Sequence, residues 1–162
     1  MEWTSTKPNS GTDRLESYGI YQLAGQLFNN FWHDAEVLEK DFRGRELARQ
    51  QVRSLDSICA NIEEGFGRGF GKELPQHLKI ARGEARESQG RYKRCQYLLN
   101  GEIISNRVAT LDLIIGGLTK TISTIEERQK NTRNAPGVTS RHPSPACRAE
   151  ASGRRQVTRH AQ

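Results

Sequence analysis

Cysteine, aromatic residues and long apolar runs are all scarce in this chain of 162 residues. Three cysteines occur, at positions 59, 95 and 147, and none forms a Cys-x-x-Cys pair. This odd number argues against a disulfide framework, and Cys59 and Cys95 fall at apolar positions where free cysteine acts as a small hydrophobe. We find no signal-peptide pattern and no apolar run of the ~20 residues that span a membrane. We therefore expect a cytoplasmic protein without a membrane partner.

The sequence also lacks the residue patterns of helical-bundle enzymes. Di-iron bundles bind metal through paired Glu-x-x-His sequences. Here asparagine stands three positions before His33, and leucine stands three positions before His77. No Ser/His/Asp order and no Cys–His pair is indicated either. We therefore expect no metal site, no cofactor and no catalytic residue, and thus a protein that is not an enzyme.

The net charge of +6 is unevenly distributed along the chain. Residues 13–130 carry 18 Lys and Arg against 17 Asp and Glu, whereas residues 131–162 carry six arginines against one glutamate. The last segment also contains three prolines and almost no aliphatic side chains, so we predict a disordered basic tail over residues 131–162. Residues 1–14 are polar and predict a flexible arm.

Four amphipathic patterns occupy residues 15–130, between the arm and the tail. Apolar residues recur every three or four positions from about 17 to 38, 45 to 64, 74 to 99 and 102 to 130. Polar and glycine-containing segments at 41–44 and 100–101 interrupt them, and no segment predicts a strand. Four long helices with short connections predict an all-α fold, an antiparallel up-and-down four-helix bundle.

The stretch NIEEGFGRGFGKELP, residues 61–75, joins the second and third patterns. A dinucleotide-binding loop would need GxGxxG after a strand, and a P-loop would need Ser or Thr where Glu73 follows Lys72. RGFGK resembles the start of an RNA-recognition motif but lacks its next aromatic residue and its sheet. We predict a helix–helix corner in which Gly65 is a left-handed C-cap and Gly67 helps the chain to reverse.

Polar residues beside this corner allow two interpretations. Arg68 and Lys72 lie next to the amino terminus of the third helix, where free N–H groups attract anions, so the corner could contact a phosphate backbone as well as reverse the chain. We expect Asn61 to hydrogen-bond the backbone and Glu64 to pair with a basic neighbour. An acid–base role for either would need a second titratable partner in a cleft, and none is evident.

Basic residues form rows on the second and third helices. Residues 43–98 carry 12 Lys and Arg against 7 Asp and Glu, and the spacing within each row places its members on one helical face. Such rows can neutralise nucleic-acid phosphates, or they can form a solvated face paired with nearby acids, and both interpretations remain open. The candidate nucleic-acid contacts are Arg45, Arg49, Arg53, Arg68, Lys72, Lys79, Arg82, Arg86, Arg91, Lys93 and Arg94.

Several apolar side chains lie beside the main seams of the helices. Phe28 and Trp32 flank the seam of the first helix, and Ile103, Leu113 and Ile114 flank that of the fourth. A small bundle cannot bury all of them, and exposed apolar strips mark association sites. We therefore expect a homo-oligomer, with burial under loops or the tail as the alternative.

The segment SICANIEEGFGR, residues 57–68, closely resembles the motif S-I-x-x-N-I-A-E-G-x-G-R. This motif belongs to bacterial four-helix bundle proteins encoded in intervening sequences of 23S ribosomal RNA genes. KELPQHLKIARGEARE, residues 72–87, aligns without gaps to K-E-F-x-x-F-L-x-I-A-x-G-S-A-x-E of the same family. The resemblance covers roughly residues 15–128. The departures at Glu63, Phe70, Pro75, His77 and Glu84 predict local differences at the entry to the third helix.

The resemblance implies a four-helix bundle protomer within a ring-shaped homopentamer. The family is also similar in fold to the accessory proteins of diversity-generating retroelements, which bind nucleic acid and a partner reverse transcriptase through a basic surface. Two hypotheses follow. The chain is a non-enzymatic homo-oligomer that binds RNA or DNA through basic helix faces, or it is a scaffold that recruits a partner enzyme such as a reverse transcriptase.

Overall fold

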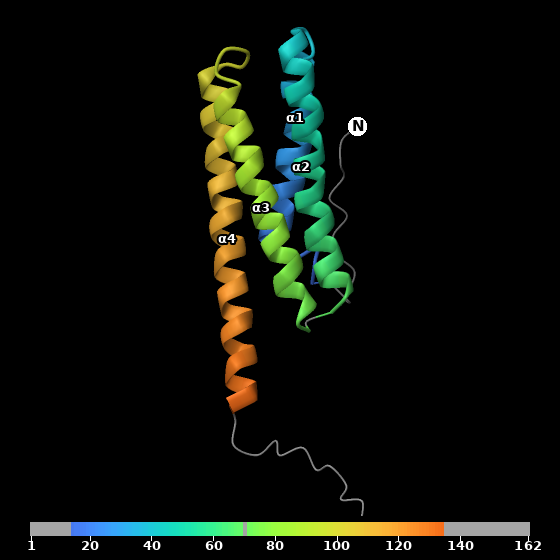
Figure 1. Cartoon of the computed structure of the whole chain (residues 1–162), viewed down its shortest axis with the longest axis vertical. Helices are drawn as coiled ribbons and strands as arrows, with labels where there is room; N and C mark the ends of the chain where they lie inside the picture. Colours follow the sequence, from blue (N-terminus) through green and yellow to red (C-terminus); the bar gives the residue numbers. More distant parts are fainter. Residues whose placement is uncertain (1–13, 70, 135–162) are drawn as a thin grey trace, which may run out of the picture.

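The computed structural model describes residues 14–69 and 71–134, which form four helices and no strand (Figure 1). α1 spans Gly19–Leu38, α2 Phe42–Gly67, α3 Glu73–Arg94 and α4 Gly101–Asn134. Each helix packs against two neighbours in the order α1–α2–α3–α4, and α1 closes the ring by contacting α4. The α2–α3 contact is the most extensive and the α1–α4 contact the least. The predicted antiparallel four-helix bundle is confirmed.

The helix boundaries differ from the predicted ones where polar residues determine them. α2 begins at Phe42 because the Asp41 carboxylate accepts a hydrogen bond of 2.8 Å from the Arg43 backbone N–H and caps the helix. α3 ends at Arg94, and hydrogen-bonded turns follow up to Leu99. α4 continues past the predicted end at 130 to Asn134. The rest of the predicted tail, and the predicted arm up to residue 13, lie outside the described residues.

The core is built from the side chains that recur every three or four positions. Phe31, Leu55, Leu78 and Leu118, one from each helix, are all buried. Burying one such side chain contributes roughly 1.5–3 kcal/mol, so the apolar seams supply most of the driving force for association of the helices. Ile114, predicted to lie beside the seam of α4, is a fully buried core residue.

A polar layer crosses the core between α1, α3 and α4. The Asp34 carboxylate, 2% exposed, accepts hydrogen bonds from Arg107 Nε at 2.9 Å and Nη2 at 3.1 Å. The Tyr92 hydroxyl donates to the same carboxylate at 2.9 Å. Burial, reinforced by the charge of Asp34, raises the pKa of Tyr92, which therefore remains a donor. The layer fixes the position of α1 relative to its neighbour α4 and to α3 on the opposite side of the bundle.

α4 is the most apolar of the four helices over a long window. A segment of Gly101–Asn134 has a mean hydropathy of 1.3 and could cross a membrane by length and composition alone. The prediction that no segment is long and apolar enough to span a membrane is therefore wrong by length and composition. The same helix supplies Leu111, Ile115, Leu118 and Ile122 to the core, which accounts for much of its apolar character.

Candidate nucleic-acid interface

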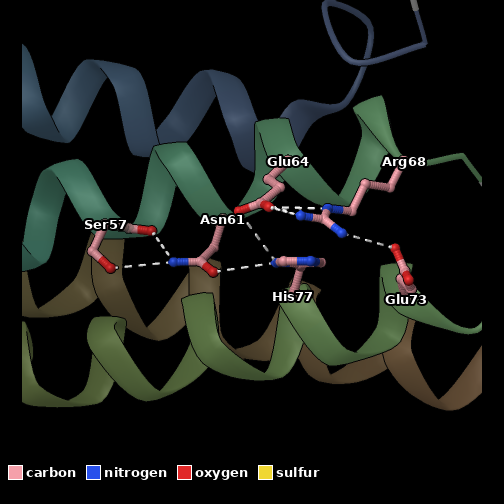
Figure 2. A network of polar contacts seen from close by, with 6 residues as sticks. All are labelled: Ser57, Asn61, Glu64, Arg68, Glu73 and His77. Atoms are coloured by element: carbon pink, nitrogen blue, oxygen red, sulfur yellow. Dashed lines mark hydrogen bonds and ion pairs between the residues drawn. The ribbon is translucent and has the colours of Figure 1, made fainter.

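The corner between α2 and α3 is held by a polar network (Figure 2). Arg68 donates from Nε and Nη2 to Glu64 Oε1 at 2.9 and 2.6 Å, and from Nη1 to Glu73 Oε2 at 3.3 Å. Glu64 lies near the end of α2 and Glu73 begins α3, so the guanidinium joins the two helices. Two carboxylates compensate its charge, and Arg68 therefore has little net charge to offer a phosphate.

Asn61 and His77 extend this network into the contact between α2 and α3. Asn61 Nδ2 donates to the Ser57 carbonyl oxygen at 2.8 Å, and Asn61 Oδ1 lies 3.5 Å from His77 Nδ1. His77 Nδ1 is also 3.8 Å from Glu64 Oε2. Asn61 and Glu64 thus make the kinds of contact expected of them. His77, half-buried in a position where the family motif has an apolar or aromatic residue, joins them.

The glycines of the corner have different roles from those predicted. α2 continues through Gly65 to Gly67, so the prediction that Gly65 is a left-handed C-cap is wrong. Gly65 is buried, and a Cβ there would lie 2.9 Å from Leu74 Cδ1. Glycine is therefore needed at this position because α2 and α3 pack closely there. Gly69, with φ of 84°, is the residue that adopts the left-handed conformation. Lys72 is exposed at the start of α3.

Arg45, Arg49 and Arg53, here called the α2 row, are all exposed. Arg45 lies on the same face of α2 as Glu63, which follows it by 18 residues or five helical turns. Glu63 accepts a hydrogen bond of 2.8 Å from the Tyr21 hydroxyl of α1. The α2 row is therefore turned toward the α1 side of the bundle. Arg49 is 3.9 Å from Glu46, and neither other arginine has an ion pair within the described ranges.

Lys79, Arg82, Arg86 and Lys93, here called the α3 row, are turned toward α4. Lys79 Nζ is 2.7 Å from Glu126 Oε1, and Arg82 Nη1 donates to Thr119 Oγ1 at 3.2 Å. The hydrogen bond from Lys79 lowers the pKa of Glu126, with a smaller contribution from the charge of Arg82.

Two members of the α3 row keep an uncompensated charge. Arg86 and Lys93 are exposed, and neither has an acidic partner in the part of the chain that the structure describes. Asp112, an acid on the facing side of α4, accepts a hydrogen bond of 2.7 Å from Gln89 instead. These two side chains are consequently available to a phosphate.

Arg91 and Arg94 differ from each other. Arg91 is half-buried, donates to the Ser54 hydroxyl of α2 and pairs with Glu87 at 2.9 Å, so it is committed to the fold. Arg94 is exposed and has no ion pair among the described residues. The structure therefore does not unite all eleven candidates. The α2 row and the α3 row lie on different sides of the bundle, Arg68 and Arg91 are engaged internally, and Lys72 lies apart at the corner.

Two exposed aromatic residues escaped the sequence predictions. Phe42 is 74% exposed and Tyr97 is 85% exposed. Phe42 lies within the predicted interruption at 41–44, and Tyr97 lies three residues before the one at 100–101. A large aromatic side chain close to a helix end is the signal that could have identified them. No group of three or more His, Cys, Asp or Glu side chains in residues 14–69 and 71–134 could hold a metal ion.

A family comparison covers the first three helices and the start of the fourth. Residues 16–107 match the family described as 23S rRNA-intervening sequence protein. Comparisons with curated proteins and with solved structures give no significant match. The matched residues make up more than half of the chain and include the whole Arg68 corner. The chain therefore belongs to the 23S rRNA-intervening sequence protein family.

Proposed function

We propose that this chain is a non-enzymatic, homo-oligomeric four-helix bundle that binds RNA or DNA through the α3 row. The observation that carries the proposal is the uncompensated charge of Arg86 and Lys93, which follow Arg82 along one side of α3. Steps of four and seven residues correspond to about one and two helical turns, so the three cations form a line rather than a cluster. A line of cations suits the regular charge of a nucleic-acid backbone.

The α3 row is a better candidate than the α2 row because of the acids around each. Asp56 and Glu63 lie on the same side of α2 as Arg45 and reduce the positive potential there. Beside the α3 row, the charge of Glu126 is compensated by Lys79, whereas Asp112 keeps its charge because its partner Gln89 is neutral. The exposed cations of α3 therefore lie near fewer uncompensated carboxylates than those of α2.

Binding of this kind should depend steeply on salt. Each phosphate that a cation neutralises releases counterions, so the logarithm of the affinity falls with the logarithm of salt concentration by roughly 0.7–0.9 per contact. The variant Arg86→Gln/Lys93→Gln should weaken binding of the full chain to a labelled structured RNA. It should also reduce the salt slope by about 2, as measured by fluorescence anisotropy across a salt series.

The matched control is Arg49→Gln/Arg53→Gln, which removes the same charge from the α2 row. All four side chains are exposed, so both variants should keep the far-UV circular dichroism of the parent. A parental affinity in the α3 variant would rule out the α3 row. A loss of binding in Arg45/Arg49/Arg53→Glu alone would assign the contact to the α2 row instead.

A second proposal is that the bundle serves as a scaffold for sister subunits or for a partner enzyme such as a reverse transcriptase. It is supported by Trp32 of α1 and Leu113 of α4, which are 55% and 63% exposed. Large apolar side chains left in water favour association. The family resemblance favours five copies in a ring. Light scattering after size exclusion, on the full chain and on Trp32→Gln and Leu113→Gln, tests this proposal. A parent that is monomeric would leave only a different protein as the partner.

A further inference from the structure

The loop end of the bundle comprises the α1–α2 connection, the start of α2 and the α3–α4 connection. Figure 1 shows both connections at the same end, opposite the corner at residues 68–72. Phe42 and Tyr97, the two most exposed large apolar side chains among those described, both lie at this loop end. The fold does not need either ring for a helix cap, since Asp41 caps α2 through its own carboxylate and the C-cap residue of α3 is Cys95.

The register of α2 against α3 places these two aromatic residues at a similar level. Gln51 donates to the Ser88 hydroxyl at 2.6 Å and fixes the antiparallel alignment. Counting nine residues back from Gln51 and nine forward from Ser88 reaches Phe42 and Tyr97. The hydrogen bonds from the Leu98 and Leu99 N–H groups to the Cys95 carbonyl oxygen keep the chain coiled over the final steps. Both rings therefore lie at the end of the same helix pair.

Several cations belong to the same end of the bundle as the two rings, but the loop end is not uniformly positive. The Arg43 guanidinium lies 5.7 Å from the centre of the Phe42 ring and pairs with Asp41 at 2.9 Å. Glu39 and Glu102 are also exposed at this end. At this end of the bundle, the cations without an ion pair to a described residue are Lys40, Arg45, Lys93 and Arg94.

We infer that the loop end binds unpaired bases of single-stranded nucleic acid by stacking them on Phe42 and Tyr97. Bases stack on exposed aromatic rings while neighbouring cations contact the backbone, and a base inside a duplex has no free face to offer. A protein partner that covered the rings would also have to bury the adjacent cations, which is costly without matching acids. The inference rests on the proposed nucleic-acid binding and adds a preference for single strands.

Stacking and charge contribute differently to salt dependence, and the test uses this difference. Full-length Phe42→Ala, Tyr97→Ala and the double variant are titrated by anisotropy with a labelled single strand that has no self-complementarity, and with a blunt-ended duplex of the same length. Each single substitution should weaken single-strand binding about 5-fold or more. The salt slope and the duplex affinity should stay at parental values.

The matched control is Ile80→Ala, which removes another exposed large apolar side chain near the start of α3, away from the loop end. It should leave single-strand affinity unchanged. Parental single-strand affinity in the double variant, or an equal loss for the duplex, overturns the inference. So does a smaller oligomer by light scattering without any loss of affinity, because the rings would then contact another copy.

The two proposals can fail separately. If the parent binds neither probe, the proposed function fails and the loop-end inference fails with it. If Arg86→Gln/Lys93→Gln weakens binding and the aromatic substitutions do not, the α3 row stands and the loop-end inference alone is wrong.

Discussion

Replacing Arg107 by methionine removes the cation that pairs with Asp34 inside the bundle. Methionine keeps an unbranched apolar stem of similar length, so the change mainly removes the charge, two hydrogen bonds to Asp34, of 2.9 and 3.1 Å, and an exposed one to Asn106. Asp34 stays 2% exposed and retains only the Tyr92 hydroxyl at 2.9 Å. The variant therefore contains a buried carboxylate without a counter-charge.

The cost follows from this geometry. Removing one partner of a buried ion pair typically destabilises a protein by about 3–5 kcal/mol. The Arg107 side chain is 14% exposed, so the site is close to solvent, and the Tyr92 hydrogen bond remains. Both facts favour the lower part of that range. A loss of about 3 kcal/mol in the free energy of unfolding corresponds to a fall in Tm of roughly 10 °C for a domain of this size.

The reciprocal change is expected to cost less. Asp34→Asn leaves Arg107 without its carboxylate, but this arginine lies close enough to the surface to reach water. The double variant Asp34→Leu/Arg107→Met replaces the pair by apolar side chains and should recover part of the stability lost in Arg107→Met. Urea unfolding of the parent, Asp34→Leu, Arg107→Met and the double variant, followed by far-UV circular dichroism, gives the coupling energy through a double-mutant cycle. A deficit below about 1 kcal/mol in Arg107→Met would refute the claim that this pair is a buried ionic link.

Three further predictions concern α2. Asp41→Ala should lower Tm more than Asp41→Asn, because asparagine can still cap the helix. Hydrogen bonds from Arg43 hold the pKa of Asp41 far below its usual range. The contribution of the Asp41 carboxylate to stability is therefore present near neutral pH and lost only in strong acid. Gly65→Ala should cost about 1–3 kcal/mol in urea unfolding through its contact with Leu74, whereas Gly67→Ala, which meets open space, should not destabilise. Burial, with the charges of Glu63 and Asp56, raises the pKa of Cys59 to about 11. This thiol should therefore react slowly with an aromatic disulfide near pH 8 until the chain is unfolded. Fast labelling of the folded protein would contradict the packing of this residue.

The fold was predictable because it depends on a local pattern. Residues such as Ile58 and Ile62 recur at helical spacing, and the period alone indicates which side of each helix is buried. The ends were less predictable because single polar contacts decide them. Asp41 extends α2 at its start, and the hydrogen bond from the Arg68 N–H to the Glu64 carbonyl oxygen carries the last turn past Gly65.

The candidate site was predictable only as separate rows. Sequence spacing places Arg45 with Arg49 and Arg82 with Arg86, but the direction of each row depends on how its helix is rotated against its neighbours. Arg107 and Asp34 show the same limit, since they are 73 positions apart and each resembles an ordinary surface residue in the sequence. Contacts between helices decide which charged side chains lack a partner, and no local sequence pattern predicts these contacts.

The positions of the apolar residues make assembly compatible with nucleic-acid binding. Leu113 lies five residues before the core residue Leu118, so the two point in directions about 140° apart and Leu113 is on the outside of α4. Trp32 belongs to α1, and neither residue is part of α3. A sister subunit that covered either one need not cover Arg86 or the loop end. Loss of assembly in Leu113→Gln should therefore reduce avidity through the number of linked sites, while each protomer keeps the salt slope of its own α3 row.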